Sequence, residues 1–380
     1  MDSLHTENLI IGAGPAGLAM AGQLRRAGRP FLLLEQSQQV ANAWRNHYDR
    51  LHLHTIKATS HLPFKPFPAH FPQYIPRQML VDYYDEYQRE MDIQPQFGQE
   101  VVAIRRAEGG GWTAATAQGR VYTAERVILC TGFNRLMQIP TWPGQEGYRG
   151  SIEHSRSYKN GRPYVNQTVL VVGMGNTGAE IALDLVEAGA RPSISLRGPI
   201  NIIPRDVLGR PTQQTAMLLA KLPTRVGDAI GILVRKLTVG DLSRYGIATP
   251  ALPPAAQLRT LGQTPVIDLG TVAHIKAGRI QIVPAIEQFK EESLLFADGQ
   301  TRQFDHVILA TGYHTGVGEL VENGRQLLNP LGHPAHWRGT GEHAGLYLLG
   351  YDAYSTGGLL HSIRLQSAEI AAEIGGEKKK

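Results

Sequence analysis

Cysteine is almost absent from this sequence, since the 380 residues include only Cys130. A single cysteine excludes an internal disulfide framework and a Cys-x-x-Cys redox centre, and it favours a reducing compartment. No window approaches the roughly 18 apolar residues of a membrane-spanning helix. Residues 1–6 contain no basic stretch that leads into an apolar run. We therefore expect a cytoplasmic protein without a membrane span.

A concentration of charge of one sign is also missing. The formal net charge is +5, but the basic residues are spread along the chain, which is typical of a solvated surface and not of a nucleic-acid-binding protein. The basic run at residues 378–380 follows two glycines and is too short to be assigned a function. Hydrophobic residues make up 42% of the chain, so a chain of this length can form two domains with ordinary cores.

Two glycine-rich loops are the most informative motifs. Both have the pattern G-x-G-x-x-G, as GAGPAG at residues 12–17 and as GMGNTG at residues 173–178. Each follows a short apolar stretch typical of a strand, residues 8–11 or 168–172, and precedes a helical pattern. The first glycine permits the turn, the second allows a pyrophosphate to approach the backbone, and the third lets the helix pack on the strand. The repeat predicts two nucleotide-binding βαβ units.

The two units differ at the end of their second strands. The predicted helices cover residues 18–27 and 179–188, and the strands after them cover residues 31–34 and 193–196. Glu35 follows the first of these strands, and Arg197 follows the second. A carboxylate at this position accepts hydrogen bonds from a ribose diol, whereas an arginine pairs with a 2′-phosphate. Unless Arg197 is an ordinary surface residue, the second nucleotide is predicted to be NADPH.

A second repeated motif indicates how the units are connected. The segments RVILCTGF at residues 126–133 and HVILATGY at residues 306–313 both have the pattern of a buried strand that ends in a Thr-Gly turn. They bracket the second nucleotide unit. We therefore expect an α/β protein with two Rossmann-like dinucleotide-binding domains. A domain of residues 138–312 would be inserted into a first domain formed by residues 1–137 and 313–380.

Two further segments have a distinctive composition. Five prolines in residues 62–76 exclude a helix or a central strand there. Residues 214–237 have a helical pattern that is broken near Pro223, with basic side chains beside apolar ones. This pattern fits a helix on a membrane surface or a helix that covers part of the inserted domain, and we expect the latter.

With these motifs the chain resembles the class B flavin-containing monooxygenases, and most closely their YUCCA-type branch, over nearly its whole length. The linker YRGSIEHSRSY at residues 148–158 is similar to the family signature F-x-G-x-x-x-H-x-x-x-Y/F, with tyrosine in place of the leading phenylalanine. Further similarities to the YUCCA-type branch are YDRLHLH at 48–54, NIIPRD at 201–206, TPVIDLGT at 264–271 and GLYLLG at 345–350. The sequence CTGF at residues 130–133 departs from the usual ATGE, which weakens the transfer of a substrate preference.

The resemblance implies an enzyme that depends on FAD, NADPH and O2. The first loop would hold FAD and the second NADPH, so that residues 138–312 form the NADPH-binding domain. NADPH would reduce the flavin, O2 would add at its C4a carbon, and the resulting (hydro)peroxyflavin would oxidise a small-molecule substrate. Two substrate classes stay open. One is a 2-oxo acid such as indole-3-pyruvate, which would lose CO2, and the other is a soft nitrogen or sulfur nucleophile. The alternatives are an NADPH oxidase or flavin reductase without a stable oxygen adduct, and a nucleotide-binding redox sensor.

Two residues are candidates for a catalytic role. His54 belongs to the segment 52–57, whose composition is unlike that of an ordinary loop, and the resemblance implies a histidine near the reactive edge of the flavin. It would be a hydrogen-bond partner of the peroxyflavin or the substrate, and the alternative is a packing histidine satisfied by the backbone. Lys57, in the same segment, is the second candidate.

The predicted cofactor contacts gather around the two loops. In the FAD unit they are Gly12, Gly14, Pro15, Ala16, Gly17, Glu35, Gln36, Trp44, Arg45 and His54. Further contacts are predicted at Val102, Thr131, Gly132, Thr311, Gly312, Tyr313, Gly350 and Leu359. Leu359 would precede a helix over residues 360–374, whose N-terminus could approach the flavin. The NADPH contacts are Gly173, Gly175, Asn176, Thr177, Gly178 and Arg197. No metal site is expected, because the histidines lack a recognisable ligand spacing. No nucleic-acid partner is expected either, and a homodimer stays open.

Overall fold

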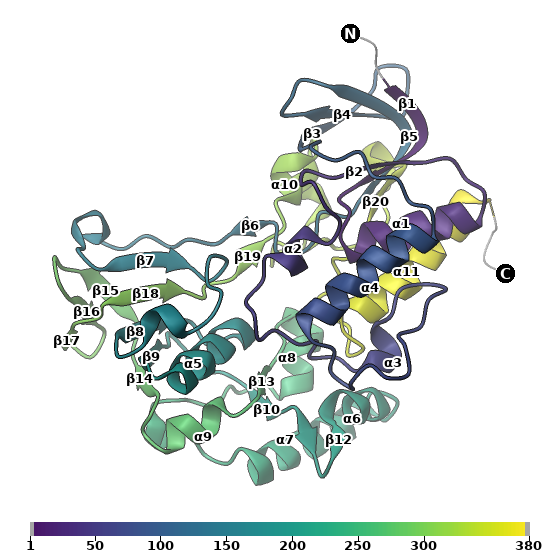
Figure 1. Ribbon diagram of the computed structural model, residues 1–380. Coiled ribbons are helices and arrows are strands. Elements are labelled where there is room, and N and C mark those ends of the chain that lie inside the picture. The colour runs from purple at the N-terminus through teal and green to yellow at the C-terminus, as the bar shows by residue number, and fades with distance from the viewer. Residues whose placement is uncertain (1–3, 377–380) are drawn as a thin grey trace. The chain divides into compact units, whose positions relative to one another are not determined.

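A computed structural model describes residues 4–376, and in it the chain divides into two compact units (Figure 1). Unit 1 comprises Met1–Asn46, Thr55–Leu136 and Tyr313–Lys380, and unit 2 comprises His47–His54 and Met137–Gly312. The short segment His47–His54, which we expected in the first domain, is thus grouped with unit 2. The basic run at residues 378–380 lies outside the described residues.

Unit 1 is built on a mixed sheet with the strand order β2-β1-β5-β4-β3, and β20 also pairs with β5. These strands are β1 Leu4–Ile11, β2 Leu32–Leu34, β3 Val101–Arg106, β4 Trp112–Thr116, β5 Val121–Leu129 and β20 Leu346–Leu348. Strand β1 runs parallel to β2 and β5, with Leu9 opposite Leu32 and Val127. Strands β3, β4 and β5 form an antiparallel meander. The first glycine loop leaves the sheet at the carboxyl end of β1.

Three long helices accompany this sheet, and α1 packs against the other two. They are α1 Pro15–Arg26, α4 Arg77–Glu90 and α11 Leu359–Ile374. A proline begins α1, where a missing N–H costs no helical hydrogen bond. A Cβ atom at Gly22 of α1 would lie 2.0 Å from the hydroxyl oxygen of Tyr87. Glycine at this position therefore lets the buried tyrosine of α4 approach α1.

The core of unit 1 is formed by the apolar side chains of the sheet. Its members include Leu9, Leu34, Ile104, Trp112, Tyr122, Val127, Leu129 and Leu346. The smaller elements are α2 Asn42–Arg45, α3 Lys57–Ser60, β6 Leu136–Met137, β19 Tyr313–His314 and α10 Val317–Leu320. Residues 62–76 contain no helix and no strand, which confirms the prediction from their prolines.

Unit 2 contains a sheet of five parallel strands in the order β14-β9-β8-β18-β7. They are β7 Ser151–His154, β8 Thr168–Val172, β9 Arg191–Ser195, β14 Gln281–Val283 and β18 His306–Leu309. The second glycine loop connects β8 to α5 Asn176–Ala188. The predicted strand at 168–172 is confirmed, while β9 begins two residues before the predicted 193–196. Both repeated strand patterns that end in Thr-Gly are strands, β5 and β18.

The remaining elements of unit 2 are short. An antiparallel sheet is formed by β15 Ile286–Phe289, β16 Leu294–Phe296 and β17 Thr301–Arg302. A parallel pair is formed by β10 Ile202–Pro204 and β13 Val266–Asp268, and a hairpin by β11 Asp206–Val207 and β12 Arg210–Pro211. The helices are α6 Thr212–Leu219, α7 Thr224–Thr238, α8 Pro254–Leu261 and α9 Thr271–Lys276. The predicted break near Pro223 is confirmed, and α7 packs on α8 and β10.

Candidate functional site

The first glycine loop has the geometry that a dinucleotide pyrophosphate requires. Gly12 has a φ of +100°, and a Cβ atom there would lie 2.7 Å from the carbonyl oxygen of Cys130. A Cβ atom at Gly17 would lie 1.8 Å from the carbonyl oxygen of Gly12, so α1 can reach β1 only with glycine here. At Gly14 a Cβ atom would meet nothing within 4 Å. The open side of the loop therefore lies at the N-terminus of α1, where helix N–H groups and the helix dipole attract an anion.

The second loop repeats this arrangement in unit 2. Gly173 has a φ of +99°, and a Cβ atom there would lie 2.8 Å from the carbonyl oxygen of Ala310. A Cβ atom at Gly178 would lie 2.1 Å from the carbonyl oxygen of Gly173, whereas one at Gly175 would meet nothing within 4 Å. The same three roles thus occur at the same three positions. Each unit has residues that fit one dinucleotide.

Glu35, at the end of β2, is buried, and its carboxylate accepts hydrogen bonds from Ala13 and Ser37. Its Oε2 accepts a hydrogen bond of 2.7 Å from the backbone N–H of Ala13, inside the glycine loop. Its Oε1 accepts hydrogen bonds from the backbone N–H and the hydroxyl of Ser37, at 2.9 and 2.8 Å. An ionised carboxylate can accept about four hydrogen bonds, so capacity for a ribose hydroxyl remains. The contact to Ala13 also fixes the loop, which the sequence motif did not indicate.

Arg197 has the opposite environment. It follows β9 by two residues, and the backbone before it is held by a 3.0 Å hydrogen bond from the N–H of Leu196 to the carbonyl of Val283. The side chain is exposed, and no described residue forms a hydrogen bond or ion pair with its guanidinium group. The group is therefore available to bind an external anion such as a 2′-phosphate.

The Thr-Gly turns that end β5 and β18 are locally ordered. Gly132 and Gly312 have φ angles of +83° and +89°. The hydroxyl of Thr131 is hydrogen-bonded to that of Tyr351 at 2.8 Å. The hydroxyl of Thr311 donates a 2.5 Å hydrogen bond to the carbonyl of Gln138. Each threonine thus uses its side chain inside its own unit, and the glycines supply the turn.

His154, from the linker signature, holds the turn of unit 2. Its Nε2 is 3.2 Å from the carbonyl oxygen of Gly312, and its Nδ1 accepts a hydrogen bond from the backbone N–H of Arg156. Burial lowers the pKa of His154 below its ordinary value, and the Gly312 carbonyl opposes this only in part. The contacts describe a neutral imidazole that donates through Nε2. They favour a structural role of this histidine over acid-base chemistry.

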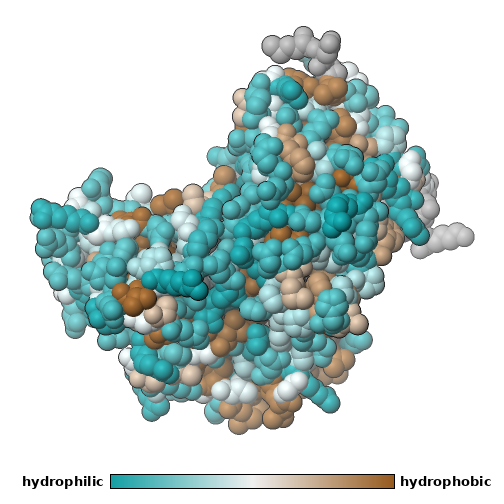
Figure 2. Space-filling model, viewed as in Figure 1, coloured by the Kyte–Doolittle hydropathy of each residue, from teal (hydrophilic) through white to brown (hydrophobic). Residues whose placement is uncertain are grey.

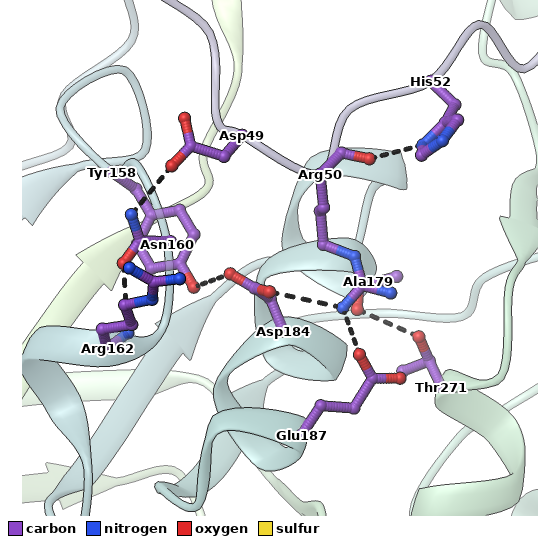
Figure 3. A network of polar contacts seen from close by, with 10 residues as sticks. All are labelled: Asp49, Arg50, His52, Tyr158, Asn160, Arg162, Ala179, Asp184, Glu187 and Thr271. Atoms are coloured by element: carbon purple, nitrogen blue, oxygen red, sulfur yellow. Dashed lines mark hydrogen bonds and ion pairs between the residues drawn. The ribbon is translucent and has the colours of Figure 1, made fainter. Parts of the chain in front are cut away.

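The segment 47–54 is fastened to α5 by a polar network (Figure 3). Nη1 of Arg50 lies 2.7 Å from Oε2 of Glu187 and 3.5 Å from Oδ1 of Asp184. The hydroxyl of Tyr158, the last residue of the linker signature, donates a 2.6 Å hydrogen bond to Oδ2 of Asp184. The side-chain amide of Asn160 donates to Oδ2 of Asp49 at 2.8 Å. The segment that carries His54 is therefore anchored to the helix that begins at the second glycine loop.

His54 itself meets a buried carboxylate. Its Nε2 lies 2.7 Å from Oε1 of Glu180, which is on α5 and has a side chain only 2% exposed. The two groups are close enough to interact, although neither oxygen of Glu180 has a hydrogen-bond partner of good geometry. The packing alternative expects a backbone group as the partner of His54. The structure instead places the side chain of Glu180 next to it. Glu180 was missed from the sequence, although a single acidic residue in an apolar helix start is a recognisable signal.

The other predicted residues of unit 1 have mixed environments. Nζ of Lys57 donates hydrogen bonds to the carbonyls of Ala69 and Phe71, at 2.9 and 2.6 Å. It thereby holds the proline-rich loop. Trp44 and Arg45 lie on α2, and the guanidinium group of Arg45 is paired with Asp85 of α4. These contacts give Lys57 and Arg45 a structural role. The catalytic role of Lys57 and the cofactor contact of Arg45 stay predictions.

The last predicted contacts are distributed over several elements and loops. A Cβ atom at Gly350 would lie 3.0 Å from Cβ of Ala16, so the chain after β20 passes next to the first glycine loop. Leu359 is the first residue of α11, close to the predicted helix start. Val102 is half exposed on β3, and Gln36 is exposed. Pro15 begins α1 and Asn176 begins α5. The amide oxygen of Asn176 accepts a 2.7 Å hydrogen bond from the N–H of Ile267, and Thr177 follows on the same turn of α5.

Among residues 4–376, neither Cys130 nor the histidines form a reactive thiol centre or a metal site. Cys130 is buried, and burial raises the pKa of its thiol well above the ordinary value. Within the same residues no group of three or more histidine, cysteine or acidic side chains could hold a metal ion. None of the described helices is long and apolar enough to cross a membrane.

Comparison with known proteins gives matches over most of the chain. Residues 9–207 match a family described as pyridine nucleotide-disulphide oxidoreductase. The chain is 36% identical to the indole-3-pyruvate monooxygenase YUCCA1 of Oryza sativa subsp. japonica over 351 residues, which cover 90% of this chain and 86% of that protein. It is 37% identical to the indole-3-pyruvate monooxygenase YUCCA6 of Arabidopsis thaliana over 359 residues, which cover 91% of this chain and 85% of that protein.

Solved structures with low sequence identity have the same fold. The flavin-containing monooxygenase from Stenotrophomonas maltophilia superposes with a TM-score of 0.74 at 21% identity, over 98% of this chain and 99% of that chain. A cyclohexanone monooxygenase from Rhodococcus sp. Phi1, bound to NADP+, superposes with a TM-score of 0.76 at 15% identity, over 99% of this chain and 85% of that chain. These similarities identify the mixed α/β architecture of two Rossmann-type domains.

Proposed function

This chain belongs to the pyridine nucleotide-disulphide oxidoreductase family and, within it, to the flavin monooxygenases that include the YUCCA proteins, and from this membership we propose how it works. The resemblance predicted from the motifs is confirmed. The protein is an oxidoreductase that depends on FAD and NADPH. We propose that it transfers one oxygen atom from O2 to a small-molecule substrate.

The assignment of the two nucleotides depends on one observation. The loops have the same glycine geometry, but a buried carboxylate ends β2 and an exposed arginine follows β9. We assign FAD to the loop at Gly12 and NADPH to the loop at Gly173, because Arg197 can pair with the 2′-phosphate that distinguishes NADPH. The proposed NADPH domain, residues 138–312, is inserted between the two parts of the FAD domain, residues 1–137 and 313–380.

FAD, when bound, would supply the redox chemistry, which is the acceptance of a hydride from NADPH and the activation of O2. The chain's own residues bind and orient. Glu35 and the open backbone at Gly14 would receive the ribose and the pyrophosphate of FAD. Gly175 and Arg197 would receive the corresponding groups of NADPH. We propose that His54, held by Glu180, faces the reacting groups and contributes a hydrogen bond there.

The proposed substrate is a 2-oxo acid of the indole-3-pyruvate type. This choice is supported by the names of relatives that are 36% and 37% identical over most of the chain. The balanced reaction converts the 2-oxo acid, O2, NADPH and H+ into the carboxylic acid one carbon shorter, CO2, H2O and NADP+. A soft nitrogen or sulfur nucleophile is the second candidate, because CTGF at residues 130–133 departs from the family sequence.

Rapid mixing tests the proposal. The purified FAD protein is reduced with NADPH, mixed with O2 and followed in the near ultraviolet, and products are then analysed with indole-3-pyruvate, a thioether and an amine. Formation of indole-3-acetate in proportion to NADPH consumed is expected. Hydrogen peroxide as the only product would instead identify an NADPH oxidase. Binding of both nucleotides without turnover would identify a redox sensor, and oxygenation of the thioether or amine alone would select the second substrate class.

A further inference from the structure

Unit 2 exposes apolar side chains in one short part of the chain. Among the described residues, seven of the seventeen large hydrophobic side chains that are exposed lie between positions 208 and 237. They are Leu208, Leu218, Leu222, Val226, Ile232, Leu233 and Leu237. Figure 2 shows hydrophobic surface along the edge where Figure 1 places α7 and β12. Neither α6 nor α7 has a buried residue.

The apolar residues of α7 form a continuous stripe. Val226, Leu233 and Leu237 follow the helical spacing of seven and four residues and therefore lie on one side of the helix. The other side faces the rest of unit 2, where both oxygens of Asp228 are hydrogen-bonded to Arg259 of α8, at 2.8 and 3.0 Å. The helix thus has this ion pair on one side and presents the apolar stripe on the other. This orientation is the reverse of the usual one for a helix on a globular protein.

The charges beside the stripe are almost all positive. Lys221 is exposed in the turn between the two helices, and Arg225 and Lys236 are exposed on α7. The only acidic residue from position 212 to 238 is Asp228, and Arg259 already neutralises it. Apolar side chains bordered by lysine and arginine are the composition of helices that lie in the interface of an anionic bilayer. Long basic side chains there reach the head groups while their stems contact the apolar layer.

The neighbouring hairpin extends this surface. Leu208, at the turn between β11 and β12, is 99% exposed, and Gly209 after it has a φ of +74°. The hairpin is held next to α6 because the hydroxyl of Thr212 donates a 2.6 Å hydrogen bond to the carbonyl of Pro204. A leucine at the tip of a tight turn has no protein surface to pack on, and it can enter a lipid layer without changing the fold.

We propose that this surface, the α6–α7 face, docks on anionic lipid bilayers as a peripheral contact. We define it by the apolar residues Leu208, Leu218, Leu222, Val226, Leu233 and Leu237 and the basic residues Lys221, Arg225 and Lys236. A bilayer fits better than a second copy of the chain, because a symmetric contact would bring the basic residues of both copies together. The membrane interpretation of residues 214–237, which the sequence pattern left as the less expected one, is therefore the one that the exposed stripe supports. The inference is independent of the proposed substrate.

Vesicle flotation with the FAD-loaded protein tests the proposal. One set of vesicles is made of phosphatidylcholine, and a second contains phosphatidylserine in addition. Binding to the second set should be stronger by about tenfold or more, because several basic residues contribute, and high salt should reduce it. The double variant Leu233→Glu with Leu237→Glu should no longer float with either set. The matched control, Leu331→Glu with Leu365→Glu, changes two leucines of similar exposure elsewhere and should bind as the wild type does.

Measurements on two further sets of variants keep the result unambiguous: the lipid preference of a charge variant, and the stability, mass and activity of the leucine variants. The variant Lys221→Glu with Arg225→Glu should lose the preference for phosphatidylserine. The melting temperature, the mass in solution and the NADPH oxidation rate of the leucine variants should equal those of the wild type, because the residues lie on an exposed surface. Three results would overturn the proposal. They are no binding of the wild type to either vesicle, a wild-type dimer that the leucine double variant separates, and a lower melting temperature that shows the face to be packed inside the molecule.

Discussion

The two glycine loops have the same backbone geometry but different side chains at the end of the next strand. In both, a Cβ atom at the third glycine would lie within about 2 Å of the carbonyl oxygen of the first, and one at the second glycine would meet nothing. Glu35 is buried and already accepts hydrogen bonds from Ala13 and Ser37, whereas Arg197 is exposed and has no partner among the described residues. The backbone thus fits a dinucleotide in general, and we propose that the side chain selects which one.

The difference also indicates how each nucleotide is used. A carboxylate that orders its own loop forms a site that is organised before its ligand arrives, which suits a cofactor that stays bound through many cycles. An unpaired arginine on the surface suits a ligand that arrives and leaves in each cycle, since no internal contact has to break. The following variants test this comparison.

The largest effect is expected from the third glycine. Gly17→Ala places a methyl group in the space of the Gly12 carbonyl, which should destabilise unit 1 by about 3 kcal/mol or more and prevent FAD binding. The matched variant Gly14→Ala should leave the melting temperature of the FAD-free protein unchanged and weaken FAD binding alone. Absorbance of bound flavin and thermal unfolding measure both. A Gly17→Ala protein that is yellow and as stable as the wild type would contradict the packing argument.

Arg197 should have the next largest effect. Arg197→Ala removes a charge-assisted contact of about 1.5–3 kcal/mol, so KM for NADPH should rise about 10- to 100-fold. Steady-state kinetics should show little change with NADH, which has no 2′-phosphate. Arg191→Ala, at the other end of β9, is the control and should change neither value. An equal rise for both nucleotides would mean that Arg197 does not recognise the phosphate.

Glu35 tests the other side of the comparison. Glu35→Gln keeps one acceptor oxygen and replaces the other with a donor, so either the Ala13 or the Ser37 contact is lost. We expect weaker FAD binding and a loss of stability of about 1–2 kcal/mol, even in the FAD-free protein. Denaturant unfolding of the FAD-free and FAD-bound forms separates the two effects. If only FAD binding changed, Glu35 would have no role in ordering the loop.

The smallest effect is expected at the contact of His54 with Glu180. Glu180→Gln removes the carboxylate that contacts His54, and the fraction of NADPH lost to hydrogen peroxide should rise by a factor of about three to ten, with KM for NADPH unchanged. His54→Ala should cause the same uncoupling, and the double variant should add nothing, because the two residues act as a unit. Additive effects, or unchanged coupling in both single variants, would return His54 to a packing role.

Much of the fold could be predicted because its signals are local. The strand Thr168–Val172, the helices after both glycine loops and the break at Pro223 follow from spacing, glycine and proline within a few residues. The proline-rich segment 62–76 without helix or strand is another local result. The predicted domain boundaries are less local, and the grouping of His47–His54 with unit 2 was not foreseen.

The sequence predicted the glycine loops of the candidate site, but not the contacts between its side chains. No spacing rule connects His54 to Glu180, since they are far apart in the sequence and meet where Arg50 holds the segment 47–54 to α5. The outward orientation of the apolar stripe on α7 was missed for a related reason. A helical pattern shows that a helix has an apolar side, but not whether the protein covers that side.

The sequence alone determined which nucleotide motifs this protein has, because a glycine loop depends on the backbone freedom of a few consecutive residues. It also determined the family, because the motifs are long and specific. The tertiary structure decided what each side chain is free to do: Glu35 is engaged, Arg197 is free, and His54 is paired with a buried carboxylate. These outcomes depend on which distant segments pack together, and packing is a property of the whole chain that no short stretch of residues contains.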